Sequence, residues 1–170
     1  MQKNLAFVFP GQGSQKPGML AELASQYPLV QNLFAEASDV LGYDLWQLVQ
    51  AGSQEDINLT ERTQPLLLTA SVAVWRIWKE QGGVTPALVS GHSLGEWSAL
   101  VCADVLAFAD AVKLVQHRGR YMQEAVPAGQ GGMAAIIGLD DDKILAACAA
   151  AAQGEVVSAV NFNSPGQVVI

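Results

Sequence analysis

Two short, largely apolar runs, each stopped by a glycine and followed by a helical pattern, constrain the fold of this chain more than any other feature. Residues 5–9 (LAFVF) end at Pro10-Gly11, and residues 87–90 (ALVS) end at Gly91. Uninterrupted apolar runs of this length are typical of strands that are buried on both faces of a parallel sheet. Because helical patterns separate and follow these runs, the sequence predicts an α/β layer fold.

Apolar residues at helical spacing predict the helices of this first part. Residues 19–41 predict two helices separated at Pro28, and residues 110–126 predict a strongly amphipathic helix. The Thr-Gln-Pro sequence at residues 63–65 predicts the start of a long helix that runs to Gln81, because proline fits the first turn of a helix.

A glycine-rich joint after Pro127 predicts a boundary between two units, residues 1–127 and residues 128–170. Residues 161–165 are expected to form an ordinary turn between the last two strands. The chain stops within an apolar strand pattern, whereas natural termini are usually polar, so we expect the second unit to be incomplete. The order strand, helix, strand, strand is typical of a small α+β unit, and the segments concerned are residues 133–138, 140–152, 156–161 and those from Gln167 onward.

Composition excludes several classes of protein. Hydrophobic residues make up 51% and charged residues 15% of the 170 residues, which excludes a disordered chain. The net charge of −7 argues against a nucleic-acid partner, because the phosphate backbone requires a basic surface. Cys102 and Cys148 match no metal spacing, so we expect reduced core cysteines and no metal site. No apolar run suits a membrane span or a signal peptide, so a cytoplasmic location without a membrane partner is expected.

The second apolar run leads into Gly91-His92-Ser93-Leu94-Gly95, which fits the G-x-S-x-G pattern of a nucleophile elbow. In such an elbow the serine lies on a strained turn between a strand and a helix, and the helix N-terminus offers amides and a positive dipole to a developing oxyanion. A tight turn with a structural serine is the alternative interpretation. The apolar strand before the motif and the helix expected after it favour Ser93 as a nucleophile.

A serine nucleophile needs a general base, and the chain contains two histidines, His92 and His117. His92 adjoins Ser93, so its side chain should diverge from the serine and form local hydrogen bonds at the turn. On a helical wheel of residues 110–126, His117 falls on the polar face and is expected to be a solvated surface residue. The sequence therefore offers no good base for Ser93.

The same wheel places Arg118 near the centre of the apolar face, between Leu114 and Met122. An unpaired buried charge costs several kcal/mol, so an anion should meet this guanidinium. One interpretation is a buried ion pair with an Asp or Glu, or a side chain that extends to the surface. The other is a carboxylate-bearing substrate that the guanidinium binds through two hydrogen bonds. The wheel alone does not decide between them.

Residues 11–15 (GQGSQ) follow the first apolar run. Lys16 stands where a dinucleotide fingerprint needs its third glycine, and no Gly-Lys-Ser/Thr follows, so neither that fingerprint nor a P-loop is expected. A plain turn is one interpretation. The other is a loop that offers backbone amides to a ligand at the carboxyl end of a parallel strand.

Several of these motifs recur together in one family. The ordered segments are residues 7–15 (FVFPGQGSQ), 63–65 (TQP), 91–96 (GHSLGE), 118–119 (RG) with Met122, and 161–167 (NFNSPGQ). Together they resemble the malonyl-CoA:acyl carrier protein transacylases of bacterial fatty-acid synthesis, which are related to the acyltransferase domains of polyketide synthases. The resemblance implies an α/β-hydrolase-like large subdomain with an inserted ferredoxin-like small subdomain.

The resemblance also implies roles for individual residues. Ser93 would take malonyl from coenzyme A as an ester and pass it to the phosphopantetheine thiol of acyl carrier protein. The backbone amides of Gln12 and Leu94 match the oxyanion hole, and Arg118 matches the arginine that binds the malonyl carboxylate. This match favours a substrate as the anion that meets Arg118. The implied partners are malonyl-CoA and acyl carrier protein, with no separate cofactor.

The family's general-base histidine lies beyond the small subdomain, and this chain ends inside that subdomain. We therefore expect both subdomains to be incomplete and the chain alone to be poorly active. One alternative function is an esterase or thioesterase of the α/β-hydrolase kind, which would deliver the acyl group to water. The absence of an HGGG-type loop and the presence of Arg118 count against it. The other alternative is a non-catalytic fragment.

Overall fold

The computed structural model describes residues 2–126 and 129–170. It divides into two compact units, Met1–Ala125 and Val126–Ile170, and each is treated by itself below. The residues at which a boundary was expected, 127–128, lie outside the described residues. Both units combine helices with strands, which confirms the mixed α/β composition predicted from the sequence.

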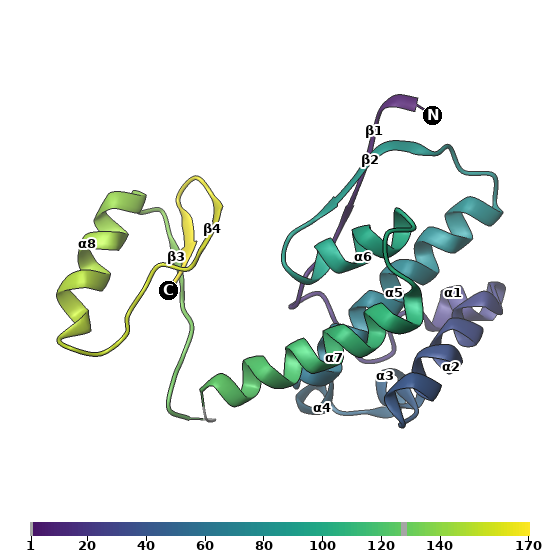
Figure 1. The fold of residues 1–170 in the computed structure, drawn as a ribbon, viewed down its shortest axis with the longest axis horizontal. Helices are drawn as coiled ribbons and strands as arrows, with labels where there is room; N and C mark the ends of the chain where they lie inside the picture. Colours follow the sequence, from purple (N-terminus) through teal and green to yellow (C-terminus); the bar gives the residue numbers. More distant parts are fainter. Residues whose placement is uncertain (1, 127–128) are drawn as a thin grey trace. The chain divides into compact units, whose positions relative to one another are not determined.

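The first unit contains a two-stranded sheet, with helices between its two strands in the sequence and after the second strand (Figure 1). Its elements are β1 (Gln2–Phe9), α1 (Ala21–Gln26), α2 (Leu29–Leu41), α3 (Leu45–Ala51), α4 (Gln54–Asn58), α5 (Thr60–Glu80), β2 (Pro86–Gly91), α6 (Leu94–Cys102) and α7 (Phe108–Ala125). The expected separation of two helices at Pro28 is confirmed. α3 and α4, which the hydrophobic pattern did not predict, begin at the capping side chains of Asp44 and Ser53.

β1 and β2 pair in parallel, with Phe7 opposite Val89 and Phe9 opposite Gly91. α5 contacts one face of this pair through its tryptophans, and α6 also packs on both strands. The ring of Trp75 stands edge-on to Phe7 at a centroid distance of 5.3 Å and to Phe9 at 6.5 Å. The parallel pairing predicted from the two apolar runs is therefore confirmed.

The opposite face of the two strands is open. Val8 is 75% exposed and Leu88 is 59% exposed. The prediction that both strands are buried on both faces is wrong for this structure, because α5 packs on the face that carries Phe7 and Phe9 while Val8 and Leu88 on the other face stay exposed. An apolar run thus indicated a strand correctly but overstated how much of it is covered.

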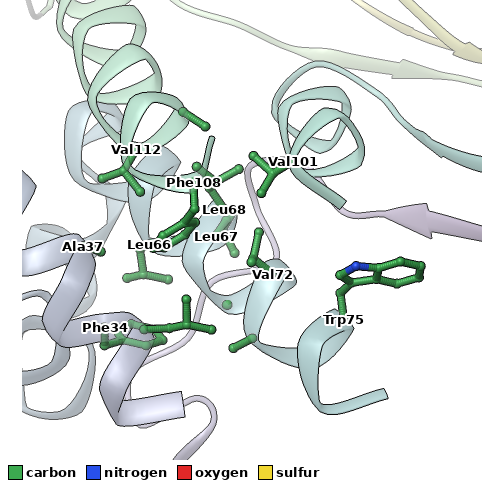
Figure 2. Packing of buried hydrophobic residues seen from close by; sticks show 14 of the residues in the cluster. Phe34, Ala37, Leu66, Leu67, Leu68, Val72, Trp75, Val101, Phe108 and Val112 are labelled. Carbon is green, nitrogen blue, oxygen red and sulfur yellow. The ribbon is translucent and has the colours of Figure 1, made fainter. Parts of the chain in front are cut away.

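α5 is the central helix of the first unit, and α2, α6 and α7 pack around it (Figure 1). Its side chains from residue 63 to residue 73 are all buried. Figure 2 shows Leu66, Leu68 and Val72 among buried residues of the neighbouring helices, including Phe34 and Phe108. Each fully buried leucine contributes roughly 1.5–3 kcal/mol, so this helix anchors the core.

α5 begins three residues earlier than the Thr-Gln-Pro sequence predicted. It starts at Thr60, so Pro65 lies inside the helix rather than in its first turn. A proline there removes one hydrogen bond of the helix. The earlier start brings Thr60 and Glu61 to the first turn, where they contact the loop after β1 and helix α7.

The second unit is a three-stranded antiparallel sheet in the order β3-β5-β4 with one helix. Its elements are β3 (Ala135–Ile137), α8 (Asp141–Ala152), β4 (Asn161–Ser164) and β5 (Gln167–Val169). Ile144 and Cys148 of α8 form a small core with Val168 of β5. β3, α8 and β5 agree in position with the predicted elements, although β3 is shorter.

The position of β4 differs from the prediction. The structure has no strand over residues 156–160, and β4 occupies residues 161–164, where a turn was expected. The turn is instead formed by Pro165 and Gly166, because Ser164 pairs with Gln167 across them. Proline followed by glycine suits the two central positions of a tight turn, so the strand extends up to that pair.

Both cysteines are buried and unpaired, as expected. Burial of Cys102 in α6 raises the pKa of its thiol from the ordinary 9.0 to about 12. Above pH 9 the unfolded chain would lose a proton that the folded chain keeps, so stability falls as pH rises between these two values. The free energy of unfolding, measured with urea, should therefore fall less between about pH 8 and about pH 10.5 in Cys102→Ala than in wild type.

The matched control for this prediction is Cys148→Ala, which alters a buried cysteine of the second unit and keeps Cys102. The wild-type slope of stability against pH should persist in this control. Burial also raises the pKa of Tyr43 to about 12, so part of the alkaline slope should remain in Cys102→Ala. Identical slopes in wild type and Cys102→Ala would show that the thiol is not the group concerned.

Candidate active site

Ser93 lies where β2 turns into α6, in a backbone conformation that residues other than glycine rarely adopt. Its φ is 54° and its ψ is −111°. Such a conformation costs roughly 1–3 kcal/mol and persists only where the surrounding structure imposes it. Gly91 ends β2 and Leu94 begins α6 on either side, so the strained turn between strand and helix that the motif predicts is present.

The two glycines of the motif are required by close backbone contacts. A Cβ on Gly95 would lie 2.2 Å from the Phe9 carbonyl oxygen, and a Cβ on Gly91 would lie 2.2 Å from the Gly95 carbonyl oxygen. Neither carbonyl is a flexible group that can move aside. The first turn of α6 therefore packs directly on the end of β1, which brings Ser93 beside the loop that follows β1.

Phe9 and Gly91 are opposite each other at the carboxyl ends of β1 and β2. Gln12 lies three residues after Phe9, and Leu94 lies three residues after Gly91, so their backbone amides lie near this end of the sheet. Neither amide donates a hydrogen bond to another described residue. The Gln12 side chain is held in place, because its Nε2 donates to Thr60 Oγ1 at 3.2 Å. Both amides are therefore without a hydrogen-bond partner among the described residues.

Arg118 of α7 reaches Ser93 directly. Its Nη2 donates a hydrogen bond to Ser93 Oγ at 3.0 Å, and its Nη1 donates to Gln64 Oε1 at 2.8 Å. Gln64 is fully buried in α5, and its Nε2 donates to Met122 Sδ at 3.2 Å. Within the part of the chain that the structure describes, no Asp or Glu forms an ion pair with Arg118. The ion-pair interpretation therefore finds no support.

Arg118 lies at the edge of the buried stripe of α7 rather than at its centre. Leu114 and Met122, which flank it on the wheel, are 46% and 49% exposed. The prediction that Arg118 lies at the centre of the buried face was wrong, because the helical wheel counted Leu114 and Met122 as core residues. The residues of α7 that are buried are Phe108, Ala111, Val112, Val115 and Gly119.

The histidines match the expectation only in part. His92 is exposed, and the hydrogen bond it forms at the turn uses its backbone oxygen, which accepts from the Gly95 amide, whereas the expected bond of its side chain is not among the described contacts. His117 is partly buried, with its ring edge-on to Tyr121 at 6.2 Å, so it is less exposed to solvent than predicted. Among the described contacts, neither imidazole bonds to Ser93 Oγ.

α7 approaches the first turn of α5 at Gly119, directly after Arg118. A Cβ at this position would lie 2.6 Å from both Glu61 Cα and the Thr60 carbonyl oxygen. The Glu61 amide also donates to Gln123 Oε1 at 2.9 Å across the same contact. This close packing sets the position of α7 and therefore of Arg118.

Gly119→Ala should force the two helices apart, and we expect it to lower the free energy of unfolding by about 1–3 kcal/mol, since backbone atoms cannot give way. Urea unfolding followed by circular dichroism measures this. Gly132→Ala is the control, because a Cβ there would meet no atom within 4 Å. Equal unfolding midpoints for wild type and Gly119→Ala would contradict the close contact.

Sequence reasoning missed Gln64 and Thr60 as parts of this site. Gln64 had a signal: it is a polar residue next to Pro65 and a run of three leucines, within a helix whose side chains are otherwise packed as core. A polar side chain in such a position is normally paired. Thr60 had no such signal, because its role depends on where α5 begins.

The described residues contain neither a membrane-spanning helix nor a cluster of metal ligands. No helix among them is both long and apolar enough to cross a membrane. No three His, Cys, Asp or Glu side chains among them are grouped as metal ligands would be. The polar side chains that converge on the site are instead those of Ser93, Arg118 and Gln64.

Comparison with known proteins shows the family of this chain. The model of the family described as "Acyl transferase domain" matches residues 6–170. The chain belongs to this acyl transferase family. Within the family it is similar to malonyl CoA-acyl carrier protein transacylase of Salmonella typhimurium, with 68% identity over 165 residues. The protein of the same name from Escherichia coli strain K12 is 67% identical over 165 residues.

The chain spans about half the length of the curated relatives it matches. The alignments cover 97% of this chain but 53% of each of these two relatives. Solved acyl transferase structures show the same relation. The malonyl-CoA:acyl carrier protein transacylase of Xanthomonas oryzae has a TM-score of 0.96 at 56% identity and is covered over 54% of its length, against 99% of this chain.

A second solved structure holds a malonyl-transacylase in complex with a type II PKS acyl-carrier protein. It has a TM-score of 0.93 at 64% identity, and the match covers 96% of this chain and 53% of that one. Because both structures are more than half identical in the matched part, the fold of the described units agrees with that of the family.

Proposed function

We propose that this chain carries the acyl-binding part of an acyltransferase that moves malonyl from coenzyme A to the phosphopantetheine thiol of acyl carrier protein in fatty-acid biosynthesis. The observation that carries the proposal is the contact between Arg118 and Ser93. A guanidinium with neutral partners lies 3.0 Å from the hydroxyl of a strained elbow serine. An acyl group that carries its own carboxylate suits such a site.

The chemistry would proceed in two steps. Ser93 Oγ attacks the thioester carbonyl while its proton passes to a base, and the coenzyme A thiolate leaves and takes up a proton. The phosphopantetheine thiol then gives its proton to the base and attacks the seryl ester, the bond between the acyl carbon and Ser93 Oγ breaks, and the serine oxygen takes up that proton. The amides of Gln12 and Leu94 would stabilise the oxyanion in both steps, each contributing roughly 3 kcal/mol by comparison with other oxyanion holes. No separate cofactor is needed.

Arg118 would supply selectivity. A malonyl group offers a carboxylate to the guanidinium, whereas an acetyl group leaves the charge without a partner. Sites built for a polar group discriminate strongly against analogues that lack it. The same reasoning separates the proposal from an esterase, which has no need for a cation beside its nucleophile.

The finer architecture is part of the proposal. We propose that residues 1–127 belong to an α/β-hydrolase-like large subdomain and residues 128–170 to a ferredoxin-like small one. The parallel β1-β2 pair and the elbow support the first assignment, and the antiparallel β3-β5-β4 sheet with α8 supports the second. A cytoplasmic location is proposed with it, as suits a fatty-acid synthesis enzyme.

We propose neither His92 nor His117 as the base that accepts the Ser93 proton, because neither contacts the serine hydroxyl. We therefore expect little or no acylation of the 170-residue chain by malonyl-CoA. Transfer is expected from a fusion in which this chain replaces the matching part of the Escherichia coli relative.

To test the function, the fusion is incubated with malonyl-CoA and acyl carrier protein, and the products are identified. Malonyl-loaded carrier protein is the expected product. Free malonate as the main product would favour the esterase alternative. A fusion that folds but forms neither product would favour a non-catalytic role for this chain.

A further inference from the structure

We propose that Gln64 is a positioning residue that sets the preference for malonyl, because it holds Arg118 through an uncharged acceptor. The inference rests on the proposed function. It concerns a fully buried side chain of α5 that contacts the guanidinium and has no assigned role.

The orientation of the Gln64 amide follows from its two neighbours. Met122 presents a thioether sulfur, which can only accept a hydrogen bond. The NH2 group of Gln64 must therefore face Met122 Sδ, at 3.2 Å, and its oxygen must face Arg118 Nη1, at 2.8 Å. The amide is thus fixed with its acceptor toward the arginine.

This contact directs the guanidinium. With Nη1 bound to Gln64, Nη2 of the planar group points to Ser93 Oγ at 3.0 Å. The guanidinium therefore lies within reach of the far end of a short acyl group attached to that oxygen. Gln64 itself lies on α5, whose side chains are buried on all sides in this region, so the acceptor has little freedom to move.

The absence of charge on Gln64 matters as much as its position. Arg120, two residues along the same helix, is within 3.5 Å of Glu124, and Arg62 pairs with Asp56 at 3.0 Å. Arg118 has no such carboxylate partner among the described residues. A neutral acceptor orients the guanidinium without neutralising it, and the full charge stays available to a ligand's carboxylate.

The test compares the affinities of the 170-residue chain for malonyl-CoA and acetyl-CoA by isothermal titration calorimetry. Gln64→Glu places a carboxylate against Arg118 and should lower the ratio of malonyl to acetyl affinity by about tenfold or more. Gln64→Met removes the acceptor without adding charge and should lower the ratio by about threefold. The control Gln47→Glu adds the same charge at an exposed position of α3 and should leave the ratio unchanged.

Acetyl-CoA affinity should stay constant in all variants, which a merely structural role for Gln64 would not allow. An unchanged ratio in Gln64→Glu, or an equal loss for both ligands, overturns the inference. If circular dichroism shows that Gln64→Glu does not fold, Gln64→Met decides by the same criterion. A wild-type chain without malonyl preference overturns instead the proposed function on which the inference rests.

Discussion

Replacement of Ser93 by alanine should abolish formation of the acyl ester and reduce malonyl transfer by the fusion by at least about 10³-fold. The hydroxyl is the one group at the elbow that can form the ester, and neither Gln12 nor Leu94 can replace it, because each contributes only an amide. Transfer of radiolabel from malonyl-CoA to the protein, and then to acyl carrier protein, measures both steps.

The control for this variant is Ser90→Ala, which removes an exposed hydroxyl from β2 just before the elbow. It should keep near-normal labelling. Alanine at position 93 meets the same backbone strain as serine, so the elbow should keep its shape and the loss should be chemical. Persistent labelling of Ser93→Ala would show that another residue carries the acyl group.

The second large effect is expected from Arg118→Ala in the same fusion. The variant should lose about 10²-fold or more in kcat/KM for malonyl-CoA, because the malonyl carboxylate would enter the site without a cation. The rate with acetyl-CoA should change much less, since acetyl has no carboxylate. Steady-state rates with both thioesters give the selectivity directly.

Arg120→Ala is the matched control, since it removes an exposed arginine two positions along α7 that lies beside Glu124. Its selectivity should equal that of wild type. If Arg118→Ala still prefers malonyl-CoA to acetyl-CoA, the role assigned to Arg118 is wrong. An equal fall for both thioesters would point to a general loss of structure rather than to carboxylate binding.

The local patterns of the sequence predicted most of the fold. Glycine after an apolar run placed the ends of β1 and β2, and Pro28 separated α1 from α2. The pattern did not predict α3 and α4, which are short and depend on capping by Asp44 and Ser53. Nor did it predict the exposure of Val8, because burial depends on which elements pack on each face.

The site was predictable where a motif is contiguous and less so where it depends on packing. The elbow around Ser93 follows from five adjacent residues. The position of Arg118 on α7 was misjudged, since a helical wheel does not show where the neighbouring helix approaches; the close contact at Gly119 sets that. The contact between Gln64 and Arg118 joins residues 54 positions apart, and local spacing does not indicate such a pair.

The most direct measurement is the location of the acyl group after the fusion has been incubated with equal concentrations of malonyl-CoA and acetyl-CoA. Intact mass followed by peptide mapping identifies both the group and the residue. We predict one malonyl group, attached to Ser93, with little acetyl. An acyl group on another residue, or acetyl and malonyl in similar amounts on Ser93, would contradict the account.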